Sequence, residues 1–205
     1  GPAVVFDEFT AKGLIDGTSI RLRQIEAQLY GGSGKGSAQL DWNGGWRLKG
    51  EFTTQRVQLY SFMDAVTRDA RSGGELESRA QFDMSASDFS RLYQSPQVQA
   101  SFTVKKGNLD GVDLVRALQG PKTEGVFGGK TRFDTLSGTL VVSGGRYQYR
   151  DLRMQSGVMV ATGQFDISAE QQVGGRVLVE LKGPTSPIRS SYSIAGDLKT
   201  IALKP

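Results

Sequence analysis

Apolar and polar residues alternate along most of the chain with a period of two, which is typical of half-buried β-strands. The segment 18–30 shows the pattern well, because Ile20 and Leu22 are followed by Ile25 and Ala27. Before residue 131, strands are predicted over 4–9, 18–30, 36–42, 46–54, 75–85 and 97–106, the last ending in a turn at Gly107–Asn108. Beyond it, strand follows strand, with turns at Gly144–Gly145, Gly157, Gly174–Gly175 and Gly183–Pro184.

Helical spacing interrupts the alternation twice. Residues 59–71 carry Leu59, Phe62, Met63 and Val66 at i, i+3, i+4 and i+7, and residues 112–118 carry Val112, Val115 and Leu118. A third turn of helix is expected in the stretch SASDFSRLY, where Ser87 or Asp88 could be the cap, and residues 119–130 are predicted to form a loop. Such short amphipathic helices are expected to cover a sheet or close the end of a barrel.

The chain also resembles itself at a distance of 127 residues. Residues 9–40 align without a gap with residues 136–167, and the aligned pairs are identical at Gly17/Gly144, Arg23/Arg150, Gln28/Gln155 and Gly36/Gly163. The apolar pattern agrees better than the identities do. We therefore interpret the two segments as copies of one β unit.

Both copies change the phase of the alternation at the same place. In the second copy Tyr147 and Tyr149 are followed by Leu152 and Met154, as Ile20 and Leu22 are followed by Ile25 and Ala27. A change of phase would turn every later side chain to the other face unless a β-bulge absorbs one residue. Bulges are therefore predicted at Arg23–Gln24 and Arg150–Asp151.

The glycine-rich stretch YGGSGKGSAQL, residues 30–40, invites comparison with a nucleotide-binding phosphate loop. That motif requires a glycine where this chain has Leu29 and a serine or threonine where it has Gly36. A strand pattern follows in place of a helix. The stretch is thus interpreted as a glycine-rich turn between strands.

Composition excludes several kinds of chemistry. The 205 residues include neither cysteine nor histidine, which rules out thiol nucleophiles, histidine bases and Cys/His metal sites. The net charge is only +4, and the only close basic pairs are Arg21 with Arg23 and Lys105 with Lys106. No nucleic-acid partner is therefore expected, and no cofactor.

An enzyme of this composition would need a pair of carboxylates, as glycoside hydrolysis does. The nearest groupings are Glu75 with Glu77 and Asp110 with Asp113. We interpret the glutamates as part of a solvent-facing strand, Asp110 as a turn residue and Asp113 as a helix start. No catalytic or metal-ligating residue is predicted, and the chain is expected not to be an enzyme.

The order of these elements resembles the carboxy-terminal region of the AsmA family. The resemblance lies in LYGGSGKGSAQLD, SASDFSRL, KKGNLDGVDLVRAL, TRFDTLSGTLVVSGGRYQYRDLRMQSG and VMVATGQFDIS, and residues 107–168 match most specifically. The loop QGPKTEGVFGGK departs from the pattern. The resemblance implies a domain of a Gram-negative envelope protein in the periplasm, attached to the inner membrane and involved in phospholipid transport and outer-membrane assembly.

The expected fold is mainly β with a few short helices, a curved and bulged antiparallel β-sheet groove or half-barrel, built from a repeated unit and lidded by helices. We expect one domain over 1–205, with helical insertions in 57–120. Gly1–Pro2 resembles a protease scar, so the chain is expected to be a soluble piece of a longer protein, with any membrane anchor outside it.

A groove of this kind would hold phospholipid on an apolar strand face. The candidate lipid-contacting residues are Tyr147, Tyr149, Met154, Met159 and Phe165, since methionine adapts to irregular apolar partners and tyrosine suits a wet rim. An alternative is a structural or protein-partner module with a filled core. In that case residues 4–9 form an edge that could pair with an upstream strand or another envelope protein. A carboxylate-based enzyme acting on glycans is a further alternative.

Overall fold

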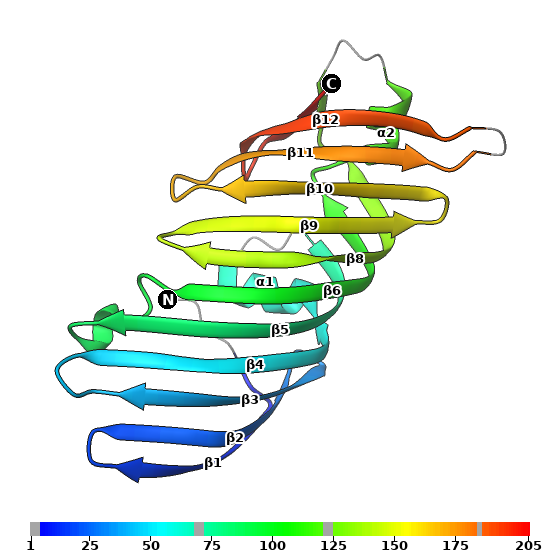
Figure 1. Cartoon of the computed structure of the whole chain (residues 1–205). Coiled ribbons are helices and arrows are strands. Elements are labelled where there is room, and N and C mark those ends of the chain that lie inside the picture. Colours follow the sequence, from blue (N-terminus) through cyan, green and yellow to red (C-terminus); the bar gives the residue numbers. More distant parts are fainter. Residues whose placement is uncertain (1–4, 68–71, 121–124, 184–185) are drawn as a thin grey trace.

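A computed structural model describes residues 5–67, 72–120, 125–183 and 186–205. Within these residues, the chain forms one open antiparallel sheet of thirteen strands with two short α-helices (Figure 1). The strands are β1 (Glu8–Asp16), β2 (Ser19–Leu29), β3 (Gly32–Asp41), β4 (Trp46–Gln58), β5 (Ser72–Ala86), β6 (Gln97–Asp110), β7 (Val126–Phe127), β8 (Lys130–Ser143), β9 (Arg146–Ser156), β10 (Met159–Ile167), β11 (Gln172–Leu181), β12 (Ile188–Asp197) and β13 (Ile201–Lys204). The helices are α1 (Leu59–Thr67) and α2 (Leu114–Gln119), and Phe89–Arg91 form a single 3-10 turn, η1.

The strands lie in the sheet almost in chain order. Each pairs with the next one along the chain, except that β7 leaves the series and pairs with β13 at the far edge. The expectation of a mainly β fold with short helices is therefore confirmed, and the sheet is open.

Bulges occur in β2, β4, β6 and β9, which are alternate strands in the order of the sheet. The ladders show one extra residue at Arg23–Gln24 of β2 and at Arg150–Asp151 of β9, as the change of phase predicted. Two further bulges lie in β4 and β6, where Arg56 and Lys106 adopt positive φ values of 55° and 51°. Each bulge keeps the apolar side chains on one face while the strand bends.

The two aligned segments have nearly the same strand boundaries. A shift of 127 residues places β2 on β9 end for end and the start of β3 on the start of β10. The agreement of strands and bulges is what a repeated unit would produce, although β8 begins five residues before the counterpart of the first residue of β1.

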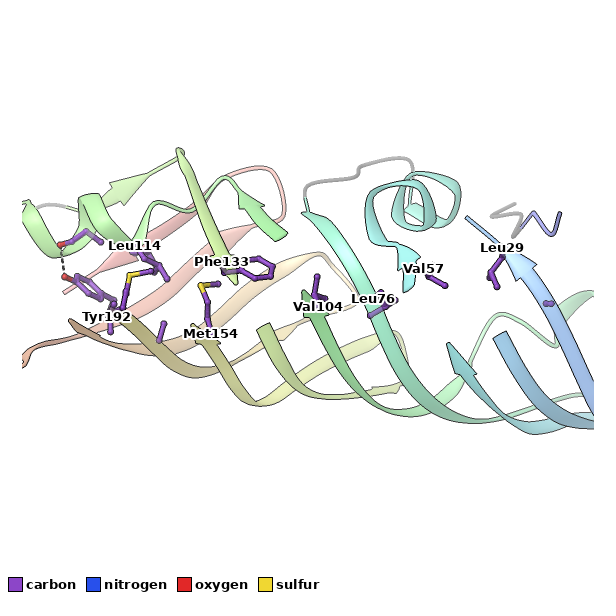
Figure 2. Packing of buried hydrophobic residues seen from close by; sticks show 14 residues of the cluster. Leu29, Val57, Leu76, Val104, Leu114, Phe133, Met154 and Tyr192 are labelled. Carbon is purple, nitrogen blue, oxygen red and sulfur yellow. Dashed lines mark hydrogen bonds between the residues drawn. The ribbon is translucent and has the colours of Figure 1, made fainter. Parts of the chain in front are cut away.

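A buried core lies between the inside of the curved sheet and the two helices (Figure 2). Strands β4 and β6 supply Val57 and Val104, and α2 supplies Leu114 and Ala117. Leu59 and Phe62 of α1 pack against the same cluster. Burial of each large apolar side chain contributes about 1.5–3 kcal/mol, so this core holds the short helices on the sheet.

The two edges of the sheet differ. All nine residues of β1 are exposed, and within the part of the chain that the structure describes β1 pairs on one side only, with β2. At the other edge, β13 and β7 complete the sheet, and Val112 makes a parallel bridge to Gly128. The exposed amino-terminal edge was predicted at residues 4–9; it lies at 8–16, and Val4 is outside the described residues.

Several predicted boundaries are wrong because the strands are longer than the pattern indicated. Gly107 and Asn108 continue β6 opposite Phe133 and Arg132, and Gly174–Gly175 lie inside β11, so neither pair forms a turn. In the glycine-rich stretch 30–40 only Tyr30–Gly31 form the turn, and β3 begins at Gly32.

Both predicted helices are present, α1 from the expected first residue and α2 with shifted bounds. α1 is described to Thr67, and residues 68–71 of the predicted helix lie outside the described residues. α2 begins at Leu114, two residues later than predicted. In the predicted loop 119–130, residues 121–124 lie outside the described residues, and Val126–Phe127 form β7. Pro184, from the predicted turn Gly183–Pro184, also lies outside the described residues.

Candidate functional site

The inner face of the sheet carries mostly apolar side chains, although Thr54 and Ser78, hydrogen-bonded to each other at 2.8 Å, lie on it between the helix-covered part and the rest. Residues directly opposite one another on neighbouring strands share a face, so the ladder pairs define rows that run across the sheet. One row consists of Leu22, Ala38, Gly50, Phe82, Val98, Val142, Tyr147, Ile167 and Val173. The next consists of Ile25, Gly36, Phe52, Ala80, Ala100, Leu140, Tyr149, Phe165, Gly175 and Ile194. We call these two the open rows.

A third row on the same face, here called the closed row, lies under the helices. It consists of Val57, Leu76, Val104, Leu136, Met154, Ala161 and Val179. Six of these seven side chains are buried, and they belong to the core shown in Figure 2. The open rows continue the same apolar face toward the other ends of the strands, away from the helices.

Most side chains of the open rows are only half-buried. Phe82, Val98 and Leu140 keep part of their surface accessible, as do the aromatic residues Tyr149 and Phe165. Half-buried apolar side chains that adjoin across nine or ten strands form a long apolar surface. A surface of this kind suits a ligand or partner that is itself apolar.

The candidate residues on β9 and β10 form two groups. Tyr149 stacks on Phe165, with ring centroids 4.4 Å apart and an interplanar angle of 22°, and Phe102 meets Tyr149 edge-on at 6.3 Å. Burial raises the pKa of Tyr149 to about 12, and nearby Tyr147 adds to the shift. Tyr147 is 42% exposed. These three predicted residues therefore lie together on the open rows.

The two predicted methionines lie elsewhere. Met154 is 4% exposed and Met159 is 3% exposed, and both belong to the core under the helices. The alternation correctly placed them on the apolar face, but it carried no information on which part of that face a helix covers. A ligand on the open rows would not reach them without displacement of the core.

The sequence did not single out the residues that β4, β5, β6 and β8 add to the open rows. Phe52, Phe82, Val98 and Leu140 are as close to the centre of the face as the predicted residues. Alternation within the segments 46–54, 75–85 and 97–106 was visible, and it could have indicated these positions. The register between strands that aligns them was not visible.

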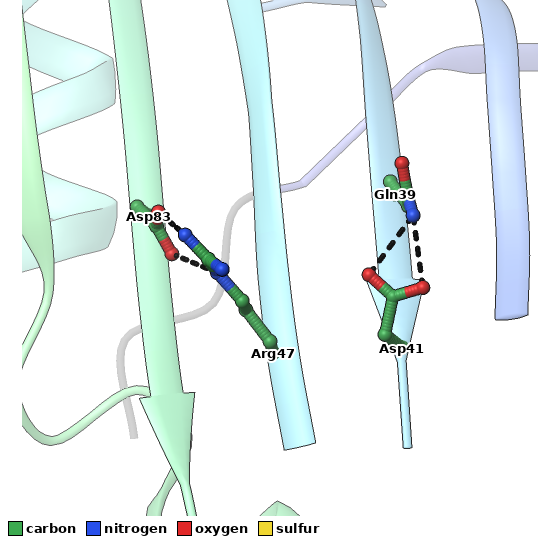
Figure 3. A network of polar contacts seen from close by, with 4 residues as sticks. All are labelled: Gln39, Asp41, Arg47 and Asp83. Atoms are coloured by element: carbon green, nitrogen blue, oxygen red, sulfur yellow. Dashed lines mark hydrogen bonds and ion pairs between the residues drawn. The ribbon is translucent and has the colours of Figure 1, made fainter. Parts of the chain in front are cut away.

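The opposite face of the sheet is polar and carries ion pairs between strands. Arg47 donates to both carboxylate oxygens of Asp83, at 3.0 and 2.6 Å, and Gln39 donates to Asp41 at 2.8 Å (Figure 3). These contacts hold the pKa of both carboxyl groups below the usual range, with Arg47 the main cause for Asp83 and Gln39 for Asp41. Exposed contacts of this kind contribute little to stability, because solvent screens them.

A shallow trough of about 570 Å³ lies on this polar face. Alternate positions of β2 to β6 turn basic, acidic and amide side chains toward it, among them Arg21, Gln39, Lys49, Glu51 and Gln81. Such a lining does not suit an acyl chain. The trough is therefore separate from the apolar surface of the open rows.

Three of the four carboxylates considered for catalysis, all except Glu75, have structural partners among the described residues. Lys105 donates to Glu77 at 2.7 Å, and Lys130 lies 3.1 Å from Asp110. Asp113 accepts from the backbone N–H of Arg116 at 2.9 Å and is the N-cap of α2, as predicted. Asp110 ends β6 and is not a turn residue.

Asp88 occupies the N-cap position of η1, but its side chain makes no capping hydrogen bond to the backbone there. Among the described residues, no group of three or more acidic side chains is placed to hold a metal ion.

Comparison with protein-family models, with curated proteins and with solved structures finds no match for this chain. In the part of the chain that the structure describes, neither helix is long and apolar enough to cross a membrane.

Proposed function

We propose that this protein is a non-enzymatic lipid-binding domain whose open rows contact the acyl chains of a phospholipid. The observation that supports the proposal is the extent of half-buried apolar side chains on the inner face beyond the part that the helices cover. Strands lie about 4.8 Å apart, so nine strands give a surface about 40 Å long. One leaflet of a bilayer has a hydrocarbon depth of about 15 Å, and an acyl chain would therefore fit along the rows.

The resemblance to the AsmA carboxy-terminal region suggests the cellular setting. We propose a domain of a periplasmic protein attached to the inner membrane through a segment outside this chain. Its role would be in phospholipid transport between the membranes and in outer-membrane assembly. Phospholipid would be the ligand, and other parts of the same protein or other envelope proteins would be its neighbours.

Two adjacent residues of β6 provide a matched test of the apolar surface. Ala100 lies at the centre of an open row, whereas Ser101 is exposed on the polar face. A photoreactive residue introduced at position 100 in cells should form lipid adducts that mass spectrometry detects, and the same residue at position 101 should not. Ala100→Arg should reduce the phospholipid that copurifies with the protein in native mass spectrometry, while Ser101→Arg leaves it unchanged.

Circular dichroism spectra that match the wild type would show that both arginine variants are folded. Equal adducts at positions 100 and 101, or none at either, would contradict lipid binding on this face.

The exposed edge favours a second candidate function, a module that joins partners by strand addition. Leu14 and Ile15 of β1 are 59% and 77% exposed, and among the described residues the strand has a neighbour on one side only. Unpaired edges of this kind recruit other strands. Ile15→Lys should then abolish concentration-dependent association in sedimentation experiments, and a wild-type protein that stays monomeric at every concentration would argue against this role.

A further inference from the structure

Four aromatic residues form a cluster at the ends of the strands that lie opposite the helices. Trp42 and Trp46 flank the turn between β3 and β4, and Phe89 and Tyr93 belong to the connection from β5 to β6. The ring centroids of Trp42 and Trp46 are 5.9 Å apart, those of Trp46 and Phe89 5.1 Å, and those of Phe89 and Tyr93 6.2 Å. Contact therefore runs without interruption from one connection to the next.

The cluster is exposed although it is aromatic. Phe89 and Tyr93 are 49% and 59% exposed, and the two tryptophans are half-buried. Leu92, between Phe89 and Tyr93, is fully buried and anchors the segment to the sheet. The segment is thus held in place while its rings face outward.

The polar atoms of these rings also lack partners. Within the described residues, neither indole N–H nor the hydroxyl of Tyr93 makes a hydrogen bond to the protein. An exposed Trp or Tyr ring with a free donor combines an apolar body with a polar tip, so the cluster is suited to an environment that is apolar on one side and wet on the other. The interface of a lipid bilayer is such an environment.

The cluster continues the apolar inner face. Leu40 pairs with Leu48, which pairs in turn with Met84. Trp42 lies two residues after Leu40 and Trp46 two residues before Leu48, so alternation directs both indoles to the same face. The aromatic residues therefore form the rim where this apolar face ends.

We propose that the aromatic cluster docks the protein on the surface of a lipid bilayer. Trp and Tyr rings enter the headgroup region, where the apolar ring and the unpartnered N–H or O–H are both accommodated. Docking at this end brings one long side of the open rows, along the ends of β3 to β6, against the membrane. The consequence for lipid transfer rests on the proposed function, whereas docking itself does not require a ligand on the open rows.

The protein carries its own reporter for the test. It contains two tryptophans, and both belong to the cluster. With vesicles of phosphatidylethanolamine and phosphatidylglycerol, we expect cosedimentation of the protein, a blue shift of its tryptophan emission, and quenching when the vesicles carry brominated acyl chains. The variant Phe89→Ser/Tyr93→Ser keeps both reporters and should lower the partition coefficient about tenfold or more.

Tyr60 of α1 provides the matched control. It is 58% exposed, like Tyr93, but it lies at the other end of β4. Tyr60→Ser should bind vesicles as the wild type does, and circular dichroism should show that all variants are folded. Equal loss in Tyr60→Ser, or unchanged binding in the double variant, would overturn the proposal. The proposal would also be overturned if the cluster mediated self-association of the protein and the protein did not bind vesicles.

Failure of docking and failure of the proposed function give different results. Lipid adducts at position 100 without vesicle binding would refute docking alone. Vesicle binding with no adduct at position 100 would refute the lipid-holding face and leave docking intact.

Discussion

The hydroxyl of Tyr192 on β12 donates a hydrogen bond of 2.7 Å to the backbone carbonyl of Ala117 in α2, 75 residues earlier in the chain. Both residues are buried, at 4% and 5% exposure. The helix has only six residues and could not persist in isolation. This bond and the burial of Leu114 therefore attach α2 to the carboxy-terminal strands.

Tyr192→Phe should lower the free energy of unfolding by about 1–3 kcal/mol, because it leaves a buried carbonyl without a partner. Urea denaturation monitored by circular dichroism measures the change. Tyr147→Phe removes a hydroxyl from an exposed ring and should change stability by less than about 0.5 kcal/mol. A loss no larger in Tyr192→Phe than in Tyr147→Phe would show that the bond contributes little.

Gly36→Ala should destabilise the sheet by about 1–3 kcal/mol through overpacking. A Cβ atom at this position would overlap the backbone oxygen of Glu51 and lie 2.6 Å from the ring of Phe52. Gly174→Ala is the control, because a Cβ there meets no atom within 4 Å. Thermal unfolding compares the two variants, and equal melting temperatures would contradict the close approach of β4 to β3.

Asp151 lies in the bulge of β9 with φ at 52°, a conformation that β-branched residues rarely adopt. Asp151→Val should therefore cost about 1–2 kcal/mol, whereas Asp151→Gly should be neutral or stabilising. Arg153→Val, at an exposed position of the same strand with ordinary backbone geometry, is the control for the change of side chain. If the two valine variants are equally stable, the left-handed bulge is not formed in solution.

The raised pKa of Tyr149 predicts a loss of stability at high pH. The folded protein holds this phenolic proton with a pKa of about 12 against an ordinary 10.0, so the contribution is complete below pH 10 and is lost as the pH rises toward 12. Tyrosinate absorbance should show one of the six tyrosines titrating late. Tyr149→Phe should abolish this late step, and Tyr60→Phe should leave it in place.

The bulges show which structural details the alternation of apolar and polar residues could predict. The skipped residue between Leu22 and Ile25 located the β2 bulge correctly, because a bulge is a local change of phase that the sequence records. The bulge of β4 was not predicted, because the predicted strand 46–54 ended before Arg56, where the bulge lies. Gly107 was assigned to a turn because glycine permits both a turn and a close approach, and here it lies against the ring of Phe133.

Four features could be recognised in the amino-acid sequence alone: the alternation, the two helical segments, the phase changes at Arg23 and Arg150, and the lack of cysteine and histidine. These properties depend on neighbours within a few residues. Three features depend on the folded arrangement: β7 pairs with β13, the helices cover Met154 but leave Tyr149 half-buried on the open rows, and Trp46 contacts Phe89. The physical reason is that a period of two places a side chain on a face, but register between strands and the position of the helices decide what covers it.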